Sequence, residues 1–411
     1  MSQIVLLIFL KGITCTHIMN RLSDKISRIQ PSMTMHLAQK AHQLKLSGED
    51  IISLVAGVPG FETPETASEA GIQAIKDGFT QYTQVDGIPE LRQAISGRYH
   101  RDFGLKLTLD EVMVTTGAKH CLHNVFNCLL NPGDEVIMHA PFWVSYPDMV
   151  RLCDATPVII EGQYQHDLKL TADELREHLT NKTKILIMCN PNNPSGVVYN
   201  EAELLEIAEV LREYPNVILV SDDIYDMIYW GKTPAQMLNV APDLKDRTII
   251  VNGVSKSYSM SGWRIGYTIA PADIIKAMVK FQSQSLSNPC SISQKAALSA
   301  LSLTHQDLQS HIETYKKRVE MVWRLLNEME GVKCIQAEGT FYLFPNIQQA
   351  MKKMGIHSDI NFCERLLSEE KLALTPGTAF GLNGYIRVTC SFSDSDLLEG
   401  MKRLQAFIQK G

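Results

Sequence analysis

The feature that most constrains the fold is a series of short apolar segments that alternate with helical segments between residues 111 and 270. Short apolar runs bounded by turn residues indicate β-strands, and the stretches between them have helical spacing. Strands that alternate with helices form a largely parallel sheet covered on both faces. We therefore expect an α/β fold with strands at Glu111–Thr115, Glu135–His139, Pro157–Ile160, Lys184–Met188, Val217–Ser221, Thr248–Asn252 and Ile265–Ala270.

Outside this region the pattern differs. Ile51–Ala56 is a short apolar strand candidate, and the last part of the chain opens with a long helical segment at Gln306–Glu330. Further short strands are expected after it, which predicts a smaller α+β domain. We divide the 411 residues into an extension expected to be disordered, an N-terminal arm with part of the small domain, a large domain and a small C-terminal domain, at 1–25, 26–65, 66–300 and 301–411 respectively.

Composition excludes several classes of function. The formal net charge is −6, and no stretch has the Lys and Arg density of a nucleic-acid-binding surface. The apolar run Ile4–Leu10 is too short to cross a bilayer, and no positive charge precedes it. The nine cysteines form no CxxC pair and no metal-ligand spacing with histidine, so we expect reduced thiols, no metal site and a cytoplasmic protein.

Because ligands of open parallel sheets bind beyond the carboxyl ends of the strands, the residues after each strand are informative. Lys256 follows Thr248–Asn252, among small residues that allow close backbone approach, and Arg264 follows eight positions later between two glycines. A lysine amine forms an imine with an aldehyde cofactor, and a nearby cation lowers its pKa. Arg264 suits bidentate contact with a phosphate.

An acid at the end of a buried strand requires a cationic partner. The strand Val217–Ser221 ends in Asp222 and Asp223, with Tyr225 close behind. A protonated pyridine nitrogen would be such a partner for Asp222, and Tyr225 could donate to an oxygen on the same ring. The alternative is that Asp222 or Asp223 caps a helix.

Two further strand exits carry candidate ligand contacts. Gly117, Ala118 and Lys119 follow Glu111–Thr115 and precede a helical segment, so they offer backbone N–H groups and the positive end of a helix to a phosphate. The loop after Lys184–Met188 contains Asn193 among prolines and asparagines. It is a tight loop in which Asn193 could donate to a cofactor oxygen.

Together these residues resemble the class I aminotransferases, which are pyridoxal-5′-phosphate (PLP) enzymes of fold type I, and most closely the bacterial aspartate aminotransferase branch. The segment Gly253–Gly266 fits the pyridoxal-lysine signature at every restricted position. The resemblance extends from about Ile26 to the C-terminus. It includes Tyr82, Gly87–Arg92, Pro141–Pro147, Asn193–Gly196, Asp222, Tyr225, Ser283–Ser285 and Arg387.

The resemblance implies a role for each residue. Lys256 carries the cofactor as a Schiff base and moves the substrate's α-proton. The other cofactor contacts would be Asp222 to the pyridine nitrogen, Asn193 and Tyr225 to the ring oxygen, Trp143 on the ring face, Gly117, Ala118 and Arg264 to the phosphate, and Tyr82 to the phosphate of the other subunit in a homodimer. The substrate contacts would be Arg387, the Gly57 N–H and Asn193 at the α-carboxylate, and Lys119 at the distal carboxylate, with Trp143 as a further substrate contact. Lys119 is also a candidate phosphate contact.

The implied reaction is a ping-pong transfer of an amino group from an L-amino acid to a 2-oxo acid, with L-aspartate and 2-oxoglutarate as the favoured pair. Two alternatives stay open: a C–S β-lyase, which begins with the same α-proton removal, and an aminotransferase for non-acidic amino acids. A regulator that uses the fold to sense PLP would need a DNA-binding domain, and the residues before the family match are too few to form one. The resemblance also implies cis bonds at Ala140–Pro141 and Asn193–Pro194.

Three positions depart from the pattern of the relatives. Gly60 stands where many have aspartate, and Gln30 stands where some that accept aspartate or prephenate have lysine. Gly253 stands where many have serine or threonine, which removes one phosphate contact.

The lysine assignment can be tested directly. Borohydride reduction of the holoenzyme, followed by peptide mapping, should place the pyridoxyl group on Lys256, and Lys256→Ala should abolish transamination while the protein still folds and binds PLP non-covalently. A label on any other lysine would contradict the assignment.

Overall fold

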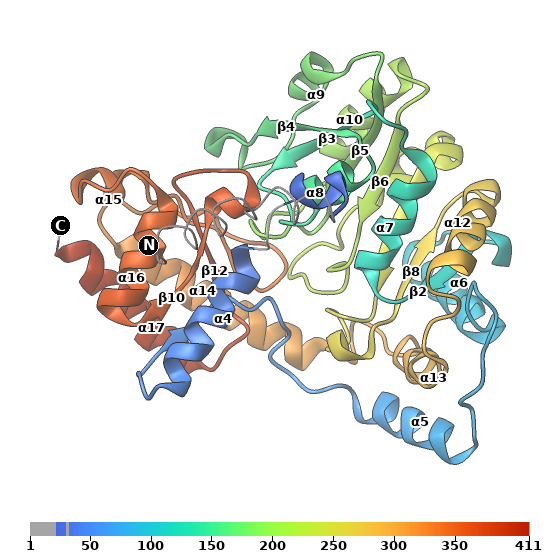
Figure 1. Cartoon of the computed structure of the whole chain (residues 1–411), viewed down its shortest axis with the longest axis horizontal. Coiled ribbons are helices and arrows are strands. Elements are labelled where there is room, and N and C mark those ends of the chain that lie inside the picture. Colours follow the sequence, from blue (N-terminus) through green and yellow to red (C-terminus); the bar gives the residue numbers. More distant parts are fainter. Residues whose placement is uncertain (1–21, 30–32, 411) are drawn as a thin grey trace, which may run out of the picture.

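The computed structural model describes residues 22–29 and 33–410 (Figure 1). Most of the expected N-terminal extension, including Ile4–Leu10, lies outside the described residues, as does Gln30. The first described residues contain a short helix, α3 (Asp24–Ser27), followed by α4 (Met33–Leu46). No helix in the described ranges is long and apolar enough to cross a membrane.

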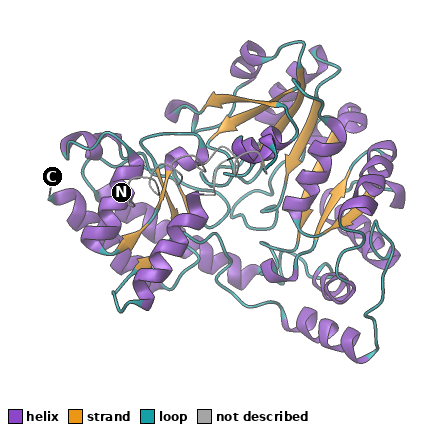
Figure 2. Ribbon diagram, viewed as in Figure 1, coloured by secondary structure: helices purple, strands orange, loops and turns teal. Residues whose placement is uncertain are grey.

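A seven-stranded sheet forms the centre of the larger part of the molecule (Figure 2). Its order is β2-β8-β7-β6-β5-β3-β4, and β8 is antiparallel to both neighbours while the other pairs are parallel. All seven predicted strands are confirmed, and no strand end differs from the prediction by more than one residue. Their bounds are β2 Val112–Thr115, β3 Glu135–Ala140, β4 Thr156–Glu161, β5 Thr183–Cys189, β6 Ile218–Asp222, β7 Thr248–Gly253 and β8 Gly266–Ile269.

Helices cover both faces of this sheet, as expected. Alternate side chains along a strand point to opposite faces: on β5, Ile185 and Ile187 belong to one buried cluster, and Leu186 and Met188 belong to another. The first cluster includes residues of α7, α8 and α12, and the second includes residues of α9 and α10. The helices around the sheet are α5 Glu65–Lys76, α6 Pro89–Phe103, α7 Ala118–Leu129, α8 Tyr146–Leu152, α9 Ala172–His178, α10 Glu201–Glu213, α11 Met237–Val240, α12 Ala272–Ser285 and α13 Ser291–Ala300.

The C-terminal part has its own buried cluster and two small sheets, in agreement with the expected α+β fold. The three-stranded sheet has the order β11-β12-β9, and the two-stranded sheet pairs β1 from the N-terminal region with β10 in parallel. The division into domains at residues 65 and 300 stays a proposal. The elements are β1 Ile52–Ser53, α14 Gln309–Glu328, β9 Tyr342–Leu343, α15 Gln348–Lys353, α16 Asp359–Glu370, β10 Leu372–Ala373, β11 Thr375–Pro376, β12 Ile386–Thr389 and α17 Asp394–Gln409.

The predicted cis bonds at Ala140–Pro141 and Asn193–Pro194 are confirmed, and a third at Asn190–Pro191 was not predicted. The two glycines that depart from the family pattern, Gly60 and Gly253, lie where the surrounding backbone leaves no room for a side chain. A Cβ on Gly60 would lie 1.9 Å from the Ser391 carbonyl oxygen, and one on Gly253 would lie 2.8 Å from the Ile265 carbonyl oxygen. With this backbone, neither position accommodates a Cβ atom.

The layered packing predicts the effect of a single truncation. Leu186 on β5 is fully buried, so Leu186→Ala should lower the free energy of unfolding by about 2–5 kcal/mol through lost burial and a cavity. Leu205→Ala on α10 is the matched control, because that side chain is 42% exposed. Chemical denaturation of both variants checks this, and equal losses would contradict the packing described here.

Candidate active site

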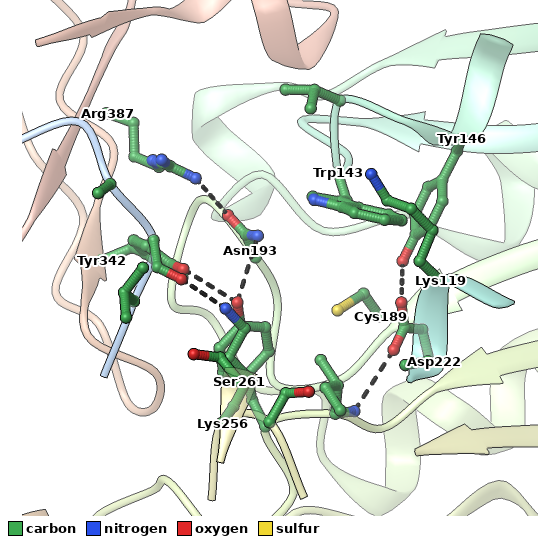
Figure 3. Close-up of a pocket in the computed structure, with 18 of the residues that line it drawn as sticks. Lys119, Trp143, Tyr146, Cys189, Asn193, Asp222, Lys256, Ser261, Tyr342 and Arg387 are labelled. Atoms are coloured by element: carbon green, nitrogen blue, oxygen red, sulfur yellow. Dashed lines mark hydrogen bonds between the residues drawn. The ribbon is translucent and has the colours of Figure 1, made fainter. Parts of the chain in front are cut away.

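A cavity of about 430 Å³ lies where the predicted site residues converge (Figure 3). Its wall combines residues that follow β2, β3, β5, β6 and β7 with residues of the C-terminal part and of the segment after β1. Ten of the twelve predicted site residues line it: Gly57, Ala118, Lys119, Trp143, Asn193, Asp222, Tyr225, Lys256, Arg264 and Arg387. Gly117 directly precedes Ala118, and Tyr82 lies outside the cavity of its own chain.

Lys256 lies on the turn that follows β7, and its Nζ donates a 2.5 Å hydrogen bond to the carbonyl oxygen of Gly57. Burial, together with the positive charges of Arg387 and Arg264, lowers the pKa of Lys256 to about 8. A substantial fraction of this amine is therefore neutral near pH 7–8, which is the form that attacks a carbonyl carbon.

Asp222 ends β6 and is buried, with no lysine or arginine paired to it among the described residues. Its Oδ2 accepts a 2.6 Å hydrogen bond from the Tyr146 hydroxyl. Burial raises the pKa of Asp222 to about 6 in spite of that bond. The helix-cap alternative for Asp222 and Asp223 is wrong, because a series of turns and no regular helix follows β6.

Tyr225 and Asn193 meet at the opposite side of the cavity. The Asn193 amide donates to the Tyr225 hydroxyl at 3.4 Å, and the Tyr225 hydroxyl is 3.0 Å from that of Tyr342. These groups come from the loop after β5, the turn after β6 and strand β9, so two parts of the fold contribute to one polar cluster.

Arg387 is buried on β12, and its guanidinium is fixed on several sides. It donates to the Asn193 side-chain oxygen at 3.3 Å and to the Val55 carbonyl at 2.6 Å, and it lies 4.6 Å from the ring centroid of Tyr342. Its Nε is buried without a hydrogen-bond partner, and no carboxylate of residues 22–29 and 33–410 pairs with it. An anionic ligand would supply the missing partner.

Helix α7 begins at Ala118, so the N–H groups of its first turn lack partners within the helix. Gly117 precedes it with φ +84°, and a Cβ there would lie 2.5 Å from Arg264 Nη2. Only glycine therefore allows Arg264 this close to the helix start. A helix N-terminus with an adjacent guanidinium is suited to bind phosphate.

Lys119 lies above the indole ring of Trp143, with its Nζ 4.8 Å from the ring centroid (Figure 3). Partial burial and the nearby charge of Arg264 lower the pKa of Lys119. Its position within the lining leaves the ammonium group available to a ligand in the cavity.

Several lining residues had no predicted role. Tyr146 lies within the motif Pro141–Pro147, but the sequence gives no indication that its hydroxyl bonds to Asp222. Tyr342 lies on β9, far along the chain, and only the packing of the two parts brings it to Tyr225 and Arg387. Cys189, Ser255 and Ser261 complete the polar wall.

The charges of the lining residues do not balance. Lys119, Lys256, Arg264 and Arg387 are basic, and Asp222 alone is acidic. Like charges in one partly dehydrated cavity repel each other unless a ligand neutralises them. A mostly parallel sheet with such a cavity beyond the carboxyl ends of its strands defines an α/β enzyme that acts on a small ligand with several negative charges.

Comparison with known proteins identifies the family. The profile of the family described as aminotransferase class I and II matches residues 49–404. A protein of Rickettsia prowazekii (strain Madrid E), named a probable aspartate/prephenate aminotransferase, is 45% identical over 393 residues, covering 94% of this chain and 98% of the relative. The chain therefore belongs to the class I and II aminotransferases, which use PLP.

Solved structures agree. The crystal structure of an aspartate aminotransferase from Rhizobium meliloti superposes with a TM-score of 0.91 and 38% identity, covering 94% of this chain and 98% of that one. An aspartate aminotransferase from Thermus thermophilus, solved with maleate, has a TM-score of 0.88 and 35% identity, covering 94% and 99%.

The residues present fit PLP. The buried carboxylate of Asp222, without a cationic side-chain partner among the described residues, suits a protonated pyridine nitrogen. The space that a Cβ on Gly117 would fill, beside Arg264, suits the phosphate.

The raised pKa of Asp222 predicts how the apoprotein responds to pH. Because the folded state holds this proton more tightly than the unfolded state, the wild-type apoprotein should lose stability as pH rises from about 4 to about 6. Asp222→Asn should remove that loss, which makes the apoprotein more stable than wild type at pH 7 by up to about 3 kcal/mol. Denaturation curves between pH 4 and pH 7 check this.

Asp173→Asn is the control for that series, because the Asp173 side chain is 93% exposed. The stability of Asp222→Asn, of wild type and of this control is compared between pH 4 and pH 7. If all three lost stability in parallel, the claim that the buried charge of Asp222 destabilises the apoprotein would be contradicted.

Proposed function

We propose that this protein transfers an amino group between L-aspartate and 2-oxoglutarate, giving oxaloacetate and L-glutamate, with PLP attached to Lys256 as a Schiff base. The observation that carries the proposal is the excess of cations in one cavity, where Lys119, Lys256, Arg264 and Arg387 accompany a single carboxylate. A phosphate and a dicarboxylic amino acid together supply the anions that this set requires.

When bound, PLP supplies an aldehyde that condenses with amines and a ring that accepts electrons. The chain supplies the base. Lys256, whose pKa is lowered to about 8, would remove the α-proton of the amino acid and return a proton in the next step. The Gly57 carbonyl, which accepts a hydrogen bond from Lys256, would hold the amine on the substrate side.

Other residues would fix the cofactor. Asp222 would pair with the pyridine nitrogen, with its orientation set by the hydrogen bond from Tyr146. Tyr225 and Asn193, already joined to each other, would bond to the ring oxygen, and Trp143 would cover the ring face. The phosphate would lie at Gly117 and Ala118, against Arg264.

Arg387 would bind the substrate α-carboxylate through its Nε, which has no hydrogen-bond partner in the protein. Asn193 and the N–H of Gly57 would assist it. Its contacts with Tyr342, Asn193 and Val55 fix the guanidinium before a substrate arrives, which lowers the entropy lost on binding. Lys119, on the other side of the cavity next to Trp143, would bind the distal carboxylate.

The choice of aspartate is supported by the relatives. Those compared are named aspartate or aspartate/prephenate aminotransferases, and the Thermus thermophilus structure contains maleate, a dicarboxylate. The cations at two sides of the cavity, Arg387 and Lys119, suit a substrate with a carboxylate at each end.

The proposal includes a homodimer with shared active sites. Tyr82 is 92% exposed and lies outside its own cavity, which fits contact with the phosphate in a second copy. Ile72 and Ile75 on α5 are more than half exposed and would be covered in that dimer. The eight described cysteines are all free, which supports a location in the reducing cytoplasm.

Substrate choice can be tested at Lys119. Lys119→Ala should lower kcat/KM for aspartate by about one to two orders of magnitude, because losing a charged hydrogen bond costs roughly 1.5–3 kcal/mol. Alanine or phenylalanine, without a side-chain charge, should be affected far less. Steady-state kinetics with the three amino acids check this, and equal losses for alanine and aspartate would make Lys119 a phosphate or structural contact.

A further inference from the structure

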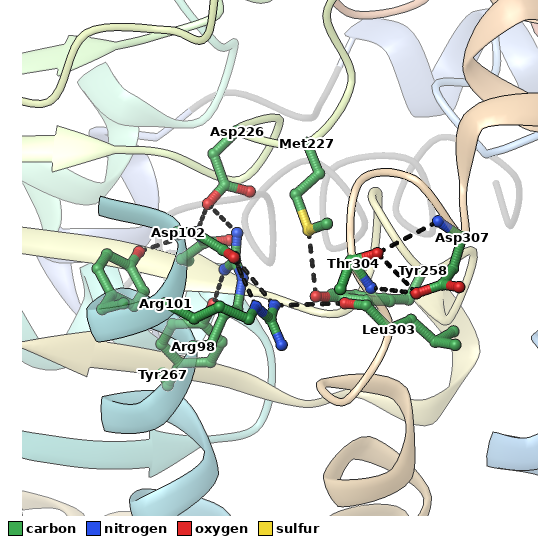
Figure 4. A network of polar contacts seen from close by, with 12 residues as sticks. Arg98, Arg101, Asp102, Asp226, Met227, Tyr258, Tyr267, Leu303, Thr304 and Asp307 are labelled. Atoms are coloured by element: carbon green, nitrogen blue, oxygen red, sulfur yellow. Dashed lines mark hydrogen bonds and ion pairs between the residues drawn. The ribbon is translucent and has the colours of Figure 1, made fainter. Parts of the chain in front are cut away.

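A buried network of charged and polar groups lies beneath the turns that carry the site residues (Figure 4). At its centre, Arg98 of α6 pairs with Asp226 at 2.5 Å, and both side chains are 1% exposed. Arg98 also donates to the Tyr267 hydroxyl of β8 at 2.6 Å and lies 3.3 Å from a carboxylate oxygen of Asp102. None of these four residues lines the cavity.

The same carboxylate oxygen of Asp226 accepts a second hydrogen bond. The Asn252 amide on β7 donates to it at 2.8 Å, and also to the Tyr99 hydroxyl at 3.1 Å. The Asn252 side-chain oxygen in turn accepts from the backbone N–H of Gly253 at 2.7 Å. A second hydrogen bond joins the same two segments: the Tyr258 hydroxyl donates to the sulfur of Met227, the residue after Asp226, at 3.1 Å.

These contacts join the segments on which the cofactor would rest. Asp226 directly follows Tyr225 and is four residues after Asp222. Asn252 and Tyr258 are on either side of Lys256, four residues before it and two after it. The network therefore connects the turn that carries the ring contacts with the turn that carries the reactive amine.

The network also reaches the phosphate side. Tyr267, which accepts from Arg98, is three residues after Arg264 and lies on β8 next to β7. Its register partner on β7 is Asn252. The Arg98–Asp226 ion pair is thus joined to three segments of the chain, and each of these segments carries different proposed cofactor contacts.

Stability alone does not account for such a pair. Removing two charges from water costs several kcal/mol per ion, and packed apolar residues of similar volume often stabilise a core as well or better. What a buried ion pair adds is direction, because the hydrogen bonds that Arg98 Nη1 and Nη2 and Asp226 Oδ2 make here form in one arrangement only. Arg98 Nε and Asp226 Oδ1 are buried without a hydrogen-bond partner, so these bonds alone define the arrangement.

We propose that Arg98 and Asp226 are positioning residues that hold the Asp222–Tyr225 turn and the Lys256 turn in register for the cofactor. This inference rests on the proposed function. Misplacement of reacting groups by about 1 Å can cost a hundredfold in rate. The pair would therefore act on cofactor affinity and on kcat, more than on the binding of the amino acid.

The test compares Arg98→Lys, which keeps the charge and loses the fork, with Asp226→Asn, which keeps the shape and loses the charge. Three quantities are measured for each: the Kd of the apoprotein for PLP, the difference between Tm with and without PLP, and kcat and KM for aspartate. Lys169→Met is the matched control, since Lys169 pairs with Glu203 at 3.0 Å, is 13% exposed and lies outside the cavity.

Both variants should weaken PLP binding by about tenfold or more and narrow the Tm difference, because the stabilisation of the folded state by PLP grows with the logarithm of the PLP concentration divided by Kd. In both, kcat should fall by about tenfold or more while KM for aspartate changes by less than about threefold. Arg98→Lys should retain more PLP affinity than Asp226→Asn. The control should lower Tm equally with and without PLP and leave Kd unchanged.

If the variants lower both Tm values equally and leave Kd and kcat at the wild-type level, the pair is only structural and the proposal is overturned. If a single variant does not fold, the same quantities are measured on the double variant Arg98→Gln/Asp226→Asn. This variant removes both charges and keeps hydrogen-bonding groups. Failure of that double variant to fold would also overturn the proposal. Failure of the proposed function is recognised separately, because wild type itself would then not transaminate aspartate, whereas failure of the positioning role leaves wild-type transamination intact.

Discussion

The active site depends on the parallel register of β5, β6 and β7. In that register Cys189 lies opposite Asp222, and Asp222 lies opposite Val251, so the ends of the three strands meet at one edge of the sheet. A shift of one residue would turn Asp222 to the other face, because side chains alternate along a strand. The apolar clusters on both faces oppose such a shift, since every buried side chain of the strand would move with it.

The register brings together charges that the apoprotein accommodates at a cost. Asp222 and Arg387 are buried and Lys256 is partly buried, and the loss of water shifts the pKa of each in the direction that favours the neutral form. Such shifts are typical of sites where a ligand supplies the missing counter-charge. The aromatic contact of Arg387 and the hydrogen bond from Tyr146 to Asp222 hold these groups without neutralising them. The preference of this cavity for anionic ligands thus arises from unfavourable electrostatics among its own charged side chains.

The sequence was most informative where local signals agree. Each strand of the seven-stranded sheet is built on a short apolar segment, and four of the strand exits carry residue types that are unusual there, so the sheet and seven of the cavity residues were predicted from the pattern. The other three, Gly57, Trp143 and Arg387, were expected from the family resemblance alone. Contacts between distant segments were not. The bond from Tyr146 to Asp222, the approach of Tyr342 to Arg387 and the ion pair of Arg98 with Asp226 depend on how helices and small sheets pack. A phenol or an arginine in a helix carries no local signal of its partner.

The central claim is that this cavity transfers an amino group and does not eliminate one. The most direct measurement is a single turnover of the PLP-loaded protein with L-aspartate and no oxo acid, followed by absorption and by product analysis. The account predicts stoichiometric oxaloacetate, pyridoxamine phosphate left in the site, and no ammonia. No oxaloacetate from aspartate, together with thiol, pyruvate and ammonia released from an amino acid that carries a β-thioether while the cofactor stays in its aldehyde form, would contradict it.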